Sequence, residues 1–137
     1  MADDFADGGA PKGARPPPKL LLVEDDTTSA SRLSQLLVED GFSVEWIDNA
    51  KAATHRLRTG QRPDAILLDY KIPHGDGVVL ARAARAQWPG IPVVFVTSYT
   101  EVVQREPPMD PPAVLISKPV AYNELISALH ALLSSVS

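Results

Sequence analysis

Short, continuously apolar runs alternate along the chain with longer segments whose apolar residues recur every three or four positions. The continuous runs suit strands that are buried on both faces, and the wider spacing suits helices that bury one face. The expected strands are KLLLV (19–23), FSVEWI (42–47), AILL (65–68), VVFV (93–96) and AVLI (113–116). The expected helices include SASRLSQLLVED (29–40), NAKAATHRLRTG (49–60), GVVLARAARAQW (77–88) and NELISALHALL (123–133).

This order predicts five strand-then-helix units in one α/β domain. Parallel strands that are apolar on both faces need helices on both sides, so we expect a doubly wound, five-stranded parallel sheet. The run FSVEWI alternates between apolar and polar residues, which favours a position nearer a sheet edge. In open sheets of this kind, ligands bind beyond the carboxyl ends of the strands. The residues that directly follow the strands are therefore the candidates for function.

Two stretches differ from this pattern. Residues 1–18, MADDFADGGAPKGARPPP, are rich in Gly, Ala, Pro and charge. Such a segment cannot bury enough apolar surface to offset its ordering entropy, so we expect a flexible tail and a folded domain at residues 19–137. The second stretch, residues 98–117, carries four prolines between the last two strands. Because proline inside a helix costs roughly 3 kcal/mol, we expect a shortened fourth helix that ends by about Arg105.

Composition excludes several classes of function. The 137 residues carry a net charge of −4, which argues against nucleic-acid binding, because that needs a basic surface. The chain has no cysteine, which excludes thiolate catalysis and cysteine-ligated metals. It shows neither an apolar run of membrane-spanning length nor the apolar core of a signal peptide. We therefore expect a cytoplasmic protein that does not contact a membrane.

The polar residues that follow four of the expected strands form the candidate site. Because the carboxyl ends of parallel strands meet at one edge of the sheet, we expect these side chains to lie close together. Asp25 or Asp26 could instead cap the helix that follows. The polar residues are Glu24, Asp25 and Asp26 after the first strand, Asp69 after the third, Thr97 and Ser98 after the fourth, and Lys118 after the fifth.

This set of side chains suits phosphoryl transfer. Clustered carboxylates raise one another's pKa unless a cation lies among them. Oxygen ligands, few in number, suit Mg²⁺, which usually shares its shell with waters and a phosphate oxygen. A carboxylate beside Mg²⁺ can attack a phosphoryl donor and form an aspartyl phosphate. The metal ion, the ammonium group and a hydroxyl would then balance the charge on the transferred group.

The stretches LLLVEDD, AILLDYKIPHGDG, IPVVFVTS and LISKP resemble, in order and spacing, the receiver domain of bacterial two-component response regulators. The resemblance covers residues 19–137 and implies the flavodoxin-like strand order 2-1-3-4-5. It implies a domain that accepts a phosphoryl group from a histidine kinase or a histidine phosphotransfer protein, and not a substrate-turnover enzyme. Because the sequence ends at Ser137, directly after the last expected helix, it resembles the stand-alone type that signals through a downstream protein.

The resemblance also assigns roles to single residues. Asp69 is the implied phosphoacceptor, Thr97 the hydroxyl donor to the phosphoryl group and Lys118 its ion-pair partner. The Lys118–Pro119 peptide bond is expected to be cis, which a following proline permits. The implied Mg²⁺ ligands are Asp25, Asp69 and the backbone carbonyl of Lys71, with Glu24 binding through water or positioning the ion.

This sequence departs from the family's pattern at one switch position. Leu115 stands three residues before Lys118, where the family usually has Tyr or Phe. With the shortened fourth helix, this departure implies either a remodelled partner-binding surface or a rigid loop without function. Lys71 and Tyr99 stand at two positions that tune phosphorylation rates in the family. Lys71 could pair with a carboxylate in the metal-free state or point into solvent.

Two other functions remain open from the sequence. A receiver fold that no longer accepts phosphate would be a phosphorylation-independent binding module, which Leu115 and the proline-rich stretch would suit. A Mg²⁺-dependent phosphatase on a similar sheet would use a second acid two residues after the nucleophile, where this chain has Lys71. The three histidines share no metal-binding spacing, and Trp46 and Trp88 are expected to serve packing.

Overall fold

The computed structural model describes residues 16–134, so most of the predicted tail at residues 1–18 lies outside the described residues. The described elements are β1 (Lys19–Val23), α1 (Thr27–Glu39), β2 (Ser43–Ile47), α2 (Ala50–Thr59), β3 (Ala65–Leu68), β4 (Lys71–Ile72), β5 (Gly75–Asp76), α3 (Gly77–Gln87), β6 (Val93–Thr97), α4 (Thr100–Arg105), β7 (Val114–Ser117) and α5 (Tyr122–Ser134).

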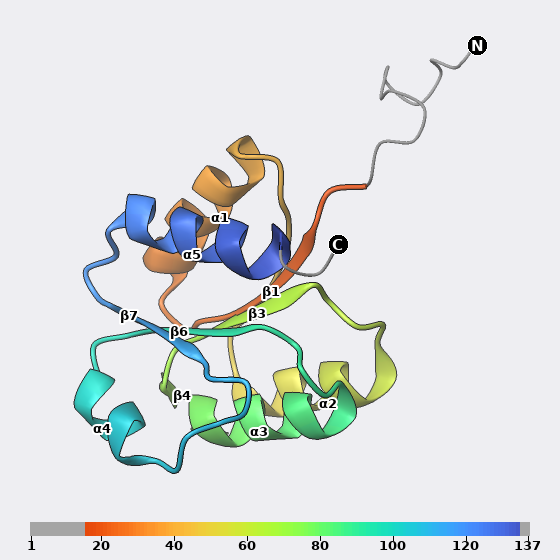
Figure 1. The fold of residues 1–137 in the computed structure, drawn as a ribbon, viewed down its shortest axis with the longest axis vertical. Helices are drawn as coiled ribbons and strands as arrows, with labels where there is room; N and C mark the ends of the chain where they lie inside the picture. The colour runs from red at the N-terminus through yellow and green to blue at the C-terminus, as the bar shows by residue number, and fades with distance from the viewer. Residues whose placement is uncertain (1–15, 135–137) are drawn as a thin grey trace.

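Five of the strands form one parallel sheet in the order β2-β1-β3-β6-β7. Counted along the chain, this is the predicted order 2-1-3-4-5, which confirms the expected fold. The alternating strand β2 lies at the edge, as its pattern indicated. Helices α1 and α5 cover one face of the sheet, and α2, α3 and α4 lie on the other side (Figure 1). The fold is therefore a doubly wound α/β domain.

Alternate residues of the central strands supply two separate cores. Leu21 and Val23 of β1 join the cluster under α2 and α3, whereas Leu20 and Leu22 join the cluster under α1 and α5. Strand β3 is buried at every position. This two-sided burial explains why the central strands are continuously apolar. Among residues 16–134, no helix combines the length and apolar character needed to cross a membrane.

The helices α1, α2 and α3 begin at polar residues that cap them. Asp26, Asn49 and Asp76 each accept a hydrogen bond from the backbone amide three residues on. Such caps satisfy amides that have no partner within the helix. Gly41 has φ of 95° just after α1, the left-handed conformation that glycine adopts readily at a helix end. These local signals fix where the helices start and stop.

The fourth helix is short, as the prolines predicted. Helix α4 has six residues, ends at Arg105 and has no side-chain cap. The loop that follows, residues 106–113, is called the proline loop here, and two arginines bind it to α3. Arg82 donates to the carbonyl of Pro107 at 2.6 Å, and Arg85 donates to the carbonyl of Pro111 at 2.6 Å. The proline loop is thus held from the side of α3.

A small hairpin between β3 and α3 was not anticipated from the sequence. Strands β4 and β5 have two residues each and pair antiparallel, with Lys71 opposite Asp76. The turn between them contains His74 with φ of 68°, an uncommon conformation for a residue with a side chain. Two-residue strands produce no recognisable periodicity, which is why the pattern did not reveal them. The hairpin directly follows Asp69 and shapes that side of the sheet edge.

Candidate functional site

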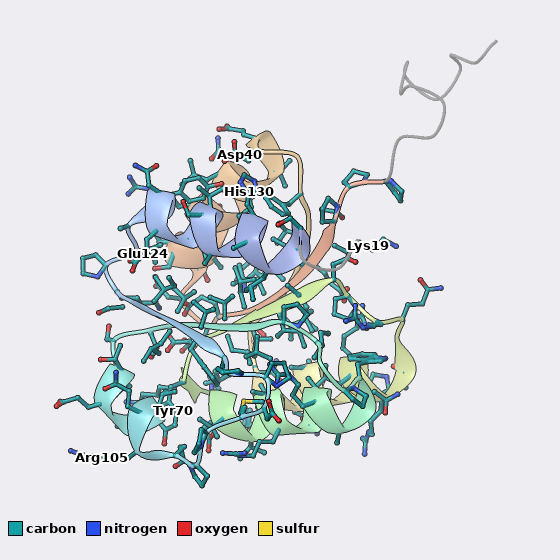
Figure 2. The ribbon with its side chains drawn as sticks, viewed as in Figure 1. Lys19, Asp40, Tyr70, Arg105, Glu124 and His130 are labelled. Carbon is teal, nitrogen blue, oxygen red and sulfur yellow. The ribbon has the colours of Figure 1, made fainter. Side chains whose placement is uncertain are left out.

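Three polar side chains from different strands meet at the carboxyl edge of the sheet. Glu24 follows β1, Asp69 follows β3 and Lys118 follows β7. We call Glu24, Asp25, Asp69 and Lys118 together the acidic rim. In Figure 2, Tyr70, the residue after Asp69, lies near α4, and Lys19 lies at the opposite end of the sheet. The rim therefore occupies the edge at which ligands of such folds bind.

Lys118 bridges the two buried carboxylates of the rim. Its Nζ lies 2.5 Å from Oε1 of Glu24 and 2.8 Å from Oδ2 of Asp69. The side chains of Glu24 and Asp69 are 7% and 9% exposed, and that of Lys118 is 20% exposed. Charged groups that are buried to this degree need partners, because isolated buried charges are very costly. One ammonium thus serves two carboxylates, which leaves the trio with a net negative charge.

Burial shifts the pKa of Glu24 upward, although Lys118 and the amide of Asp26 hydrogen-bond its carboxylate and act in the opposite direction. For Lys118, burial is the largest single influence and lowers the pKa. Its hydrogen bonds to Asp69 and Glu24 and the attraction of their negative charges together outweigh burial, so the pKa of Lys118 is raised. The lysine therefore remains an ammonium at neutral pH, and Glu24 takes up a proton more readily than an exposed glutamate does.

The backbone around Asp69 is held tightly. Its amide donates to the carbonyl of Val23 at 3.1 Å, and its Oδ1 accepts from the amide of Tyr70 at 2.6 Å. The amide of Gly77 donates to the carbonyl of Tyr70 at 2.7 Å. A Cβ at Gly77 would lie 2.1 Å from the backbone oxygen of Asp69, so a larger residue there would displace the site. Glycine at the start of α3 is thus a requirement of this close approach.

The three acids that follow β1 have different surroundings. Glu24 is buried, whereas Asp25 and Asp26 are exposed. Asp26 accepts hydrogen bonds from the amide and the hydroxyl of Ser29, which lower the pKa of its carboxyl group. Of the two aspartates that could cap the following helix, Asp26 does so. Asp25 is therefore left as the exposed carboxylate next to the rim's buried pair.

Thr97 and Lys71, two further predicted site residues, lie outside the bridged trio. Thr97 is fully buried, and its hydroxyl accepts from the amide of Tyr99 at 3.1 Å. Ser98 next to it is exposed. Lys71 is also exposed, and its Nζ lies 5.8 Å from the ring centroid of Tyr99. Of the two positions that the sequence left open for Lys71, the structure shows the solvent-facing one, over an aromatic ring.

The rim's donor set fits a hard divalent cation. Carboxylate and carbonyl oxygens are the ligands that Mg²⁺ prefers, and the rim carries three carboxylates against one ammonium. Between residues 16 and 134, no three acidic or histidine side chains already converge closely enough to hold a metal ion. In this arrangement, the ammonium of Lys118 lies between Glu24 and Asp69. The negative charge and the oxygen ligands of the rim thus favour a bound cation. The ammonium of Lys118 already compensates part of that negative charge.

One contact of the rim was missed in the sequence. The indole Nε1 of Trp46, on β2, donates to the backbone carbonyl of Glu24 at 2.7 Å. The sequence alone predicts only a packing role for this residue. Its position near the carboxyl end of an edge strand, opposite Leu22 of β1, was the available signal.

The fold and the site define a class, namely flavodoxin-like α/β domains with an acidic site at the carboxyl edge of the sheet. Within that class, the family model of the response regulator receiver domain matches residues 20–130. The chain therefore belongs to the response regulator receiver domain family. Domains of this family are signalling modules of two-component systems, which confirms the resemblance found in the sequence motifs.

Individual relatives agree with this assignment. The chain is 32% identical over 102 residues to the response regulator MprA of Mycolicibacterium vanbaalenii, a match that covers 74% of this chain and 44% of the relative. The chain thus spans less than half the length of that curated relative. A response regulator receiver protein from Sinorhizobium medicae superposes with a TM-score of 0.77 at 24% identity, covering 88% of this chain and 98% of the other, and shows the shared fold. A CheY-like receiver domain protein from Methanospirillum hungatei has a TM-score of 0.76 at 25% identity, covering 87% and 95% of the two chains.

Proposed function

We propose that this domain accepts a phosphoryl group on Asp69 from a phosphohistidine of a histidine kinase or a histidine phosphotransfer protein. The bond between phosphorus and the donor nitrogen breaks, and a bond to a carboxylate oxygen of Asp69 forms. The observation that carries the proposal is the setting of Asp69, a buried carboxylate at the end of β3 whose Oδ2 lies 2.8 Å from an ammonium. That ammonium can offset negative charge on the incoming group.

The other rim residues, together with Thr97 and Lys71, have defined parts in this proposal. Lys118 is the cation that pairs with the phosphoryl oxygens, and Thr97 supplies a hydroxyl donor from the neighbouring strand. Mg²⁺ would be held by Glu24, Asp25, Asp69 and the backbone carbonyl of Lys71. When bound, the metal ion supplies further compensation for the charges of the carboxylates and the phosphoryl group. The exposed carboxylate of Asp25 and the net negative charge of the rim support a cation at this position.

Phosphorylation of Asp69 would alter contacts with a downstream protein. The proposed surface is the region around α4, β7 and α5. It lies next to the rim, because β7 pairs with β6 and leads directly into Lys118. The amide of Lys118 donates to the carbonyl of Thr97 at 3.0 Å. Action as a cytoplasmic domain, without contact to nucleic acid or a membrane, is part of the same proposal. The net charge of −4 supports the exclusion of nucleic acid.

The test is intact mass after incubation with acetyl phosphate, with and without Mg²⁺. We expect a Mg²⁺-dependent gain of one phosphoryl group in the wild type and none in Asp69→Asn. Asp64→Asn is the matched control, because Asp64 lies at the other end of the same strand and accepts a hydrogen bond from the amide of Lys19. Equal phosphorylation of Asp69→Asn and the wild type would reject Asp69 as the acceptor.

A phosphorylation-independent binding module is the second candidate. The specific observation in its favour is that Lys118 already satisfies both buried carboxylates, so the rim is stable as it stands. Failure of the wild type to take up phosphate from acetyl phosphate or any candidate kinase, together with failure to bind Mg²⁺, would make this the better proposal.

A further inference from the structure

Trp46 connects the edge strand β2 to the acidic rim. Its indole N–H donates to the carbonyl of Glu24 at 2.7 Å, although the residue as a whole is 39% exposed. A tryptophan N–H that leaves water usually finds a hydrogen-bond partner, and the partner here is a backbone carbonyl of the rim itself. The hydrogen bond therefore suggests a more specific role for this side chain.

The hydrogen bond from Trp46 lies where the backbone hydrogen bonds between β1 and β2 end. The amide of Glu24 donates to the carbonyl of Ile47 at 3.0 Å, one residue beyond the last paired residues of β1 and β2. In a continued parallel ladder, the next backbone amide of that neighbouring strand would donate to the carbonyl of Glu24. Here the chain turns away, and Asn49 caps α2. The indole N–H donates in its place, so β2 holds both backbone groups of Glu24.

The side chain of Glu24 is held independently. Its Oε1 accepts from Lys118 at 2.5 Å, and its Oε2 accepts from the amide of Asp26 at 3.1 Å. The carbonyl that Trp46 engages belongs to the peptide plane between Glu24 and Asp25. Fixing that plane fixes the direction in which the backbone enters Asp25, the exposed carboxylate of the rim.

We propose that Trp46 is a positioning residue: its indole N–H holds the Glu24–Asp25 peptide in the orientation that lets the rim bind a divalent cation. The proposal rests on the Mg²⁺ site of the proposed function. It names a residue outside the motifs on which the family resemblance was based. The ring edge, and not the ring's bulk, carries this role.

The test compares Trp46→Phe with the wild type and with Trp88→Phe. Phenylalanine keeps an aromatic six-membered ring and removes the pyrrole ring with its N–H donor, and Trp88→Phe makes the same loss of ring elsewhere. Trp88 is the matched control. It is the C-cap residue of α3 and precedes β6, so it lies at the amino-terminal end of the strands, opposite to the rim. Since a typical hydrogen bond contributes about 0.5–1.5 kcal/mol, we expect the Mg²⁺ dissociation constant of Trp46→Phe to rise about three- to tenfold. Trp88→Phe should bind Mg²⁺ as the wild type does.

A second measurement uses the wild type, so it does not depend on the folding of the variant. Two indole N–H signals are expected in the ¹⁵N-¹H spectrum, and Trp88→Phe identifies which one belongs to Trp46. Addition of Mg²⁺ should shift the Trp46 signal and leave the Trp88 signal unchanged. The inference would be overturned by an unchanged Mg²⁺ affinity in a folded Trp46→Phe. It would also be overturned if the Trp46 signal did not shift at saturating Mg²⁺.

These outcomes separate the inference from the proposed function. If the wild type neither binds Mg²⁺ nor takes up phosphate, the proposed function fails, and the inference fails with it. If the wild type does both and Trp46→Phe matches it in Mg²⁺ affinity and phosphorylation, the role of Trp46 alone is rejected.

Discussion

The acidic rim and the segment from Ser98 to Ala113 are attached to the domain in opposite ways. Glu24, Asp69 and Lys118 follow strands of the sheet and bond one another across it. The segment contains α4, which has no fully buried residue, and a proline loop that Arg82 and Arg85 hold from α3. The rim residues thus extend from the sheet itself, whereas the segment that departs from the family pattern is held by arginines of α3 and by partly buried residues that pack against the core.

Removing Lys118 should affect the rim most strongly. Lys118→Ala would leave two buried carboxylates without their cation, and we expect a loss of about 3 kcal/mol in the free energy of unfolding near pH 7. Because the folded-state pKa of Lys118 is raised, its stabilising contribution is present below lysine's ordinary pKa and is lost only as the pH rises above it. Urea denaturation measures the loss.

The same variant gives a pH test of Glu24. Its pKa is already raised by burial, so protonation at lower pH should remove one uncompensated charge in Lys118→Ala. The stability deficit should therefore be smaller at pH 5 than at pH 8. The exposed Lys51 supplies the control, since Lys51→Ala should be nearly neutral at both values. A deficit that does not depend on pH would contradict the coupling between Glu24 and Lys118.

Removing the two arginines that hold the proline loop should not prevent phosphorylation at the rim. The double variant Arg82→Ala/Arg85→Ala removes the hydrogen bonds to the carbonyls of Pro107 and Pro111, together with the one from Arg85 to the carbonyl of Ile91, and we expect a loss of about 2–3 kcal/mol. Hydrogen exchange at the amide of Glu106, which donates to the carbonyl of Val103 at 3.1 Å, should accelerate, while phosphorylation of Asp69 should continue. If phosphate uptake fell as steeply as stability, the two regions would not be separable. Arg58→Ala, on the exposed part of α2, is the control.

An aromatic ring at position 115 should be tolerated. Leu115 is partly buried and, with Phe95, Val103 and Met109, lines a groove of about 320 Å³ beside the proline loop. The groove offers space for a larger side chain, so Leu115→Tyr should cost less than about 1.5 kcal/mol. Thermal or urea denaturation checks this value. A loss above about 3 kcal/mol would mean that the loop cannot move to admit the ring.

The smallest expected effect concerns Lys71, which lies where the two regions meet. Its Nζ is 5.8 Å from the ring of Tyr99, a contact that contributes about 0.5–1 kcal/mol at an exposed site. Lys71→Ala should expose the side of the β4–β5 hairpin next to Asp69. We therefore expect the lifetime of the acyl phosphate to shorten about two- to fivefold. The decay of phosphorylated protein over time provides the measurement. An unchanged lifetime would show that Lys71 does not influence dephosphorylation.

Much of the fold was predictable because its signals are local. Continuous apolar runs predicted the buried strands, the alternating run predicted the edge strand, and the prolines predicted an α4 that ends at Arg105. The cis peptide between Lys118 and Pro119 agrees with the expectation as well. The polar residues after the strands indicated where the site lies, because a parallel sheet brings those ends to one edge.

The contacts within the site were less predictable, since they depend on where side chains point. The sequence left open whether Asp25 or Asp26 caps α1, and the choice depends on backbone angles at Asp26. It did not show that Lys118 bonds Glu24 as well as Asp69, nor that Trp46 reaches a backbone carbonyl. Such contacts join residues far apart in the chain, and no periodic pattern encodes them.

The distance along the chain between the rim's charges has a consequence for biosynthesis. Lys118 lies 94 positions after Glu24 and 49 after Asp69. As the chain leaves the ribosome, both carboxylates emerge well before the ammonium that compensates them. A nascent chain arrested before β7 therefore carries Glu24 and Asp69 without their counter-charge, and the rim is completed only when the last strand joins the sheet.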